Sequence, residues 1–113
     1  MVELTKEQVD KVLEAIELSR KGGKLRKGAN EVTKALERGQ AKLVVVAKDV
    51  SPPEIVMHLP VLADEKGVLC VEVPRKEELG LAASIKVPTA AVAIVQEGEA
   101  KALIKELLAE LKK

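Results

Sequence analysis

The polar side chains with the most informative spacing lie in segment 27–39, which reads KGANEVTKALERG. On a helix, Asn30, Lys34 and Arg38 share one face because they are four residues apart, and Glu31 lies beside Asn30 and three residues before Lys34. An amide both donates and accepts hydrogen bonds, a carboxylate accepts them, and an ammonium group donates them, which together suits the edges of nucleotide bases. The spacing therefore predicts a hydrogen-bonding face at one end of a helix.

The same residues also fit a purely structural role. Asn30 could cap the N-terminus of the helix, Glu31 could interact favourably with the helix dipole, and Glu31 and Lys34 could form an ordinary surface ion pair. Residue types alone slightly favour this structural interpretation.

Charge is distributed unevenly along the chain. The net charge is only +1, yet residues 20–38 contain seven basic and two acidic side chains, a local charge of +5. The remainder of the chain then carries −4. Such asymmetry indicates a localised anion-binding face, although a solvated run of charges is the commoner explanation for one cluster of this size.

Catalytic and metal-binding chemistry has little support in the sequence. His58 is the only histidine and has no sequence-local nucleophile or metal partner, and Cys70 is the only cysteine and lies in an apolar run, where a thiol is usually an inert small hydrophobe. The dipeptide Gly23-Lys24 lacks the Ser or Thr and the upstream glycine of a phosphate-binding loop. We therefore expect no enzyme activity, no metal and no cofactor.

Composition predicts one globular domain, residues 1–113, with 47% hydrophobic and 33% charged residues. No N-terminal signal and no membrane-spanning apolar run is evident, and the single cysteine suits a reducing compartment, so we expect a cytoplasmic protein with no membrane association. Phe, Tyr and Trp are absent, which excludes aromatic stacking on bases and favours an engineered or simplified sequence.

Helices and strands alternate in the predicted order. Thr5 to Gln8 form a capping-box pattern, and Ser51, Pro52 and Glu54 form a second helix start. Apolar periodicity predicts helices over 5–21, 29–38, 52–66, 76–83 and 99–111, strands over 43–47, 68–73 and 90–95, and a weakly signalled strand over 24–27. Strand 43–47 is apolar throughout, as expected for a strand buried on both faces. One α/β domain with helices on both faces of the sheet is the expected architecture.

Several segments resemble, in order and spacing, the archaeal kink-turn-binding large-subunit ribosomal protein family, whose members also serve as the core RNA-binding protein of box C/D and box H/ACA guide ribonucleoproteins. The matching segments are Gly28–Lys34 with Arg38-Gly39, Asp49–Ile55, His58–Pro60, Leu79-Gly80 and Ile85–Pro88. The resemblance covers nearly the whole chain. It implies a three-layer α/β/α sandwich with a small mixed sheet, and recognition of the kink-turn, an RNA bend stabilised by tandem sheared G·A pairs.

The resemblance also implies a role for each matching position. Asn30, Glu31 and Lys34 would contact the guanine edges of the sheared pairs. The positions implied to approach the RNA backbone are Lys27, Gly28, Arg38 and Lys76, and those implied to support the extruded nucleotide are Ile55, Ile85, Lys86, Val87 and Pro88. The implied partners are kink-turn RNA, ribosomal or guide, and ribonucleoprotein subunits, bound by a monomer.

The sequence departs from the family pattern in three respects. Ser51 replaces an acidic residue near the extruded nucleotide, Lys86 replaces a glutamate in the loop triplet, and aliphatic residues such as Val45 replace strand aromatics. Two alternatives to RNA binding therefore stay open: a protein-interaction adaptor, and a simplified scaffold of the same fold with weak or no RNA binding.

Overall fold

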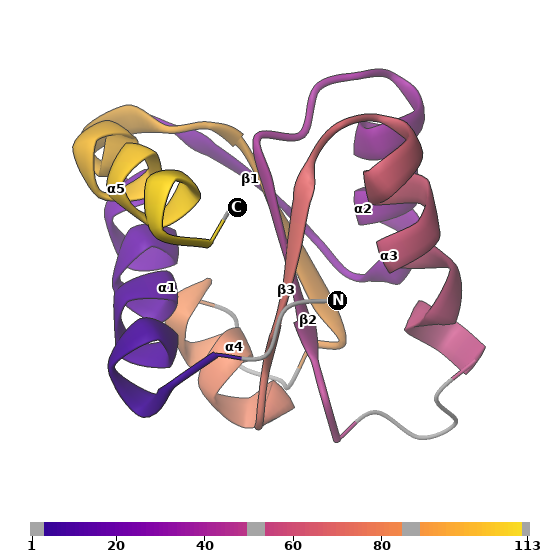
Figure 1. Cartoon of the computed structure of the whole chain (residues 1–113), viewed down its shortest axis with the longest axis horizontal. Helices are drawn as coiled ribbons and strands as arrows, with labels where there is room; N and C mark the ends of the chain where they lie inside the picture. Colours follow the sequence, from indigo (N-terminus) through magenta and orange to yellow (C-terminus); the bar gives the residue numbers. More distant parts are fainter. Residues whose placement is uncertain (1–3, 50–53, 85–88, 112–113) are drawn as a thin grey trace.

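A computed structural model describes residues 4–49, 54–84 and 89–111, which form a four-stranded sheet between two layers of helices (Figure 1). The elements in chain order are α1 (Lys6–Ser19), β1 (Lys24–Lys27), α2 (Ala29–Glu37), β2 (Leu43–Ala47), α3 (Glu54–Glu65), β3 (Leu69–Val73), α4 (Lys76–Ala82), β4 (Ala91–Gln96), the 3-10 turn η1 (Gly98–Ala100) and α5 (Lys101–Leu111). Figure 1 shows α1, α4 and α5 on one side of the sheet and α2 and α3 on the other. The predicted three-layer α/β/α fold is confirmed.

The strand order is β1-β4-β2-β3, with β2 parallel to β3 and the other pairs antiparallel. All five residues of the central strand β2 are buried, as predicted. Its side chains alternate between two cores: Leu43, Val45 and Ala47 pack under α1, α4 and α5, while Val44 and Val46 pack under α2 and α3. The sheet therefore separates two aliphatic clusters, the larger of which includes Ile16, Ile94, Ile104 and Leu107.

The first helix begins where its capping box predicts. The Thr5 hydroxyl accepts the backbone N–H of Gln8 at 3.2 Å, and the Gln8 side chain accepts the backbone N–H of Thr5 at 3.0 Å. The helix ends at Ser19, two residues before the predicted end, because the N–H groups of Arg20 and Lys21 bond to carbonyls three residues back.

The other predicted boundaries agree closely with the structure. Most differ by one residue or less, α3 ends at Glu65, and the first turn of the last helix is the 3-10 turn η1. Residues 51–53, which carry the predicted start of α3, lie outside the described residues. The described ranges contain no helix whose length and apolar content would let it cross a membrane.

The turn between α1 and β1 packs backbone against backbone on the turn between β4 and η1. The N–H of Glu99 donates to the carbonyl of Lys21 at 3.2 Å. A Cβ atom on Gly23 would collide with the backbone oxygens of Gln96 and Ser19. This crossing fixes the start of β1, the strand that leads to the candidate site.

Candidate functional site

The start of α2 is held at one edge of the sheet by Gly28. The N–H of Gly28 donates to the carbonyl of Ala91, the first residue of β4, at 2.8 Å. Gly28 adopts φ +94°, a conformation that L side chains rarely adopt, and a Cβ there would have nothing within 4 Å. The backbone at Gly28 is therefore open to close approach from solvent.

The exposed face of α2 presents the predicted polar trio. Val32, Ala35 and Leu36 are buried against the sheet, as predicted. The side chains of Glu31 and Lys34 are 52% and 58% exposed. Asn30, in the same helical turn as Glu31, is also exposed. The structure thus brings the trio together on the solvent side of α2.

Among the structural interpretations of this trio, N-capping by Asn30 is wrong, whereas the Glu31–Lys34 ion pair is confirmed. Gly28, not Asn30, is the N-cap of α2, because the β1–α2 turn places the cap two residues earlier. The Glu31 carboxylate and the Lys34 ammonium group do form an ion pair, at 3.7 Å. An exposed pair of this kind contributes about 0.2–1 kcal/mol. The fold therefore depends little on Glu31, whose carboxylate is half exposed and accessible to a ligand.

The first turn of α2 is favourable to negative charge. Its N-cap has no side-chain hydrogen bond to the first backbone N–H groups. Such groups carry the positive end of the helix dipole. Lys27, directly before the cap, and Arg38, the C-cap, are both exposed. Two carboxylates, an amide and three cations therefore occupy this helix and its two ends.

Lys76 lies apart from α2, at the start of α4 across the sheet (Figure 1). Its backbone N–H donates to Asp49 Oδ1 at 2.7 Å, and the N-cap residue Arg75 makes no side-chain capping bond. Asp49 therefore caps α4 from the turn after β2. Sequence reasoning missed this contact because the two residues lie far apart in the chain.

The residues expected to support an extruded nucleotide are only partly described. Ile55 lies within α3, but its side chain is outside the described residues, as are Ile85, Lys86, Val87, Pro88 and Ser51. The segment that follows position 88 is anchored near α2, since Ala90 accepts the N–H of Ala47 at 2.9 Å and Ala91 accepts that of Gly28. Ala90 and Ala91, two and three residues after position 88, therefore lie beside the end of β2 and the start of α2.

A hydrogen bond joins α2 to α3. The Thr33 hydroxyl donates to the carbonyl of Ala29 at 2.7 Å, and His58 Nε2 lies 2.7 Å from the same hydroxyl oxygen. Because the hydroxyl proton is directed to Ala29, Nε2–H is the donor to Thr33. His58 is a helix residue, as predicted, and it orients α2 through Thr33, one residue before Lys34. The sequence contained no signal for this pairing.

Cys70 is 7% exposed, and burial raises the pKa of its thiol to about 12. Because deprotonation of the thiol is easier in the unfolded chain, with its ordinary pKa of 9.0, the free energy of unfolding is expected to fall as pH rises from about 9 towards 12.

At pH 8, iodoacetamide should label Cys70 in the native protein roughly 1000-fold more slowly than in the urea-unfolded chain, because thiolate is the reactive form. Equal labelling rates, followed by mass spectrometry, would contradict the buried-thiol assignment.

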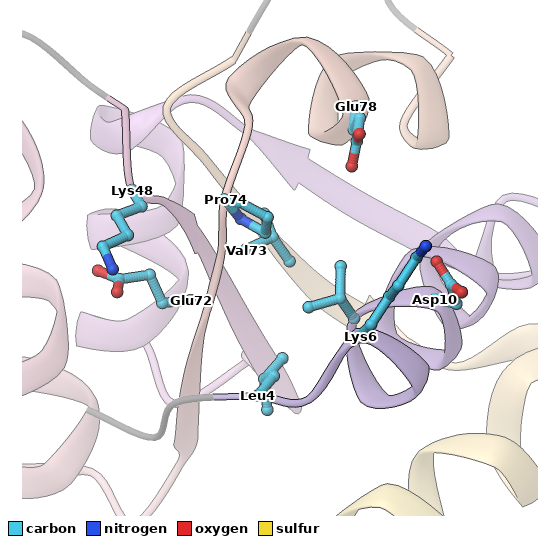
Figure 2. Close-up of a pocket in the computed structure, with 9 residues that line it drawn as sticks. Leu4, Lys6, Asp10, Lys48, Glu72, Val73, Pro74 and Glu78 are labelled. Carbon is cyan, nitrogen blue, oxygen red and sulfur yellow. The ribbon is translucent and has the colours of Figure 1, made fainter.

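A hollow of about 520 Å³ lies away from α2, between α1, α4 and the ends of β2 and β3 (Figure 2). Its apolar side chains come from Leu4, Val9, Val73 and Pro74, and its charged ones from Lys6, Asp10, Lys48, Glu72 and Glu78. Figure 2 shows the Lys48 and Glu72 side chains pointing toward one another. With three acids against two lysines, this hollow is unsuited to a polyanion.

The described ranges contain no cluster of three or more His, Cys, Asp or Glu residues that could hold a metal ion.

Comparison with known proteins identifies one similar solved structure and one protein family. A solved structure described as a Giardia lamblia 15.5kD RNA binding protein superposes with a TM-score of 0.90 and 31% sequence identity, over 99% of this chain and 93% of that one. Residues 10–104 match the model of one protein family. The chain belongs to the ribosomal protein L7Ae/L30e/S12e/Gadd45 family.

Proposed function

We propose that this protein binds RNA without catalysis and recognises the kink-turn, the bend with tandem sheared G·A pairs. The proposal is supported by the family, by the similar 15.5kD RNA binding protein, and above all by one observation on this chain. That observation is the exposed trio of Asn30, Glu31 and Lys34 on the first turns of α2.

The carboxylate in this trio favours base recognition over simple phosphate attraction. Seven of the nine charged residues in segment 20–38 are basic, which suits a phosphate backbone. A carboxylate repels phosphates, but it accepts hydrogen bonds from the N–H groups of a guanine. Glu31 next to Asn30 therefore supports a face that reads base edges, while Lys27 and Arg38 position the backbone.

Binding would stabilise the bent RNA by population shift. A free kink-turn exchanges between extended and bent forms, and a ligand shifts that equilibrium by its differential affinity for the two. The packing of Val32, Ala35 and Leu36 and the Thr33–His58 bond hold α2 in place. A fixed face of this kind contacts only one RNA geometry well.

We expect a labelled kink-turn RNA to bind at least about tenfold more tightly than a matched duplex or a variant with disrupted G·A pairs. A single good base-edge contact contributes about 1–3 kcal/mol of discrimination, and a plain duplex does not present these edges. The RNA carries the label because the protein has no Trp or Tyr whose intrinsic fluorescence would report binding. Affinity should fall with salt, with a log–log slope of about 0.7–0.9 per phosphate contact. Equal affinity for kink-turn and duplex would refute the proposal.

A protein-interaction adaptor is the second candidate, and one observation favours it. Met57 and Val61 lie one helical turn apart on α3 and are 62% and 63% exposed. Two apolar side chains on one exposed helix face offer a contact surface for a partner protein. Salt-insensitive or absent RNA binding in the titration above would leave the adaptor as the better interpretation.

A further inference from the structure

A second hollow, of about 510 Å³, lies where the α1–β1 turn meets the end of α4. Its lining residues are Arg20, Lys21, Gly23, Leu25, Lys27, Ala83 and Ser84. It contains three cationic side chains and no acidic one. It therefore differs from the hollow of Figure 2, which has more acids than lysines.

The geometry of this basic hollow is fixed by contacts between elements. Arg20 Nη1 donates to the carbonyl of Ala82, in the last turn of α4, at 3.3 Å. This bond uses one of the five N–H donors of the guanidinium group, so the others are available. On the opposite wall, Gly23 is held by the backbone crossing with the β4–η1 turn. The guanidinium group is thus positioned before any ligand arrives.

Lys27 links the basic hollow to the start of α2. Lys27 lines the hollow and directly precedes Gly28, the N-cap of α2. Ser84, which also lines the hollow, follows α4 and is the last described residue before segment 85–88. A strand of nucleic acid that contacts the start of α2 would therefore lie close to one cation of the hollow.

We infer that the basic hollow binds a backbone phosphate of the same RNA, in the stem that leaves the kink, and so extends the interface beyond the base-reading trio. This inference rests on the proposed function. Converging cations around an open depression suit the phosphodiester of a passing strand, which needs charge neutralisation and donors but no enclosed pocket.

The test is a series of kink-turn RNAs in which each stem is shortened stepwise, titrated against Lys21→Gln and a matched control. Lys21 is exposed, and only its backbone takes part in the turn, so the substitution removes one charge and leaves the turn intact. Lys66→Gln is the control, because Lys66 is an exposed lysine after α3 that neither lines the basic hollow nor belongs to α2 or its two ends. Circular dichroism establishes that both variants are folded.

The wild type and Lys66→Gln should lose affinity severalfold at the step that removes the contacted phosphate, whereas Lys21→Gln should lose clearly less at that step, because only Arg20 and Lys27 remain in the hollow. The salt slope of Lys21→Gln should also be smaller by about one. Identical responses of the two variants to shortening would overturn the inference. Should the wild type bind kink-turn and duplex equally, the proposed function fails, and the hollow is then judged on the duplex: a smaller salt slope for Lys21→Gln supports it, and equal slopes overturn it.

Discussion

Glu31→Ala is expected to weaken kink-turn binding by about 1–3 kcal/mol, roughly 5- to 150-fold, because it leaves guanine donors without an acceptor at the interface. Folding should change little, since the Glu31–Lys34 pair is exposed and an acidic residue in a first helical turn contributes only about 0.3–1 kcal/mol. Titration at one fixed salt concentration measures the affinity, and circular dichroism measures the fold.

Glu37→Ala is the matched control for this effect. Glu37 is exposed at the end of the same helix, so its removal makes the same change in net charge without touching the trio. Loss of a negative charge near phosphates should leave its affinity unchanged or slightly tighter. If Glu31→Ala behaved like Glu37→Ala, α2 would be only an electrostatic surface.

Gly23→Ala is expected to destabilise the fold by about 3 kcal/mol, the upper part of the range for overpacking. The added Cβ would meet three backbone atoms, from Gln96, Ser19 and Gly98, none of which can move aside like the end of a flexible side chain. Urea unfolding followed by circular dichroism measures the loss.

A substitution at the neighbouring Gly22 distinguishes steric crowding from backbone strain. Gly22 has φ +74°, but a Cβ there would have nothing within 4 Å. Gly22→Ala should therefore cost only about 1–2 kcal/mol, the strain of a left-handed conformation. Equal losses for the two variants would show that the backbone crossing is looser than described.

The helices and central strands were predictable because their signals are local. The Thr5 capping box, the apolar spacing of α2 and the fully apolar β2 each determine one element without reference to distant residues. β1 was only weakly signalled because its sequence, KLRK, is mostly exposed, and its pairing with β4 makes it a strand. The strand order depends on pairing between distant segments, which no local pattern encodes.

The candidate site was predictable to a similar degree. Asn30, Glu31 and Lys34 lie together because helical spacing dictates it. The contacts that position them come from elsewhere in the chain: Ala91 holds Gly28, and His58 holds Thr33. Likewise, the basic hollow joins Arg20 to the end of α4, residues that the sequence places far apart.

The complete burial of β2 also bears on aggregation. An apolar, largely β-branched run such as Leu43–Ala47 is the kind of segment that stacks into intermolecular cross-β structure when a chain is unfolded. In the native sheet both of its edges are paired, with β4 and β3. The residues on either side, Lys42 and Lys48, are exposed lysines. Their like charges would oppose the in-register stacking of neighbouring chains. These two lysines therefore protect the strand against aggregation whenever the sheet opens.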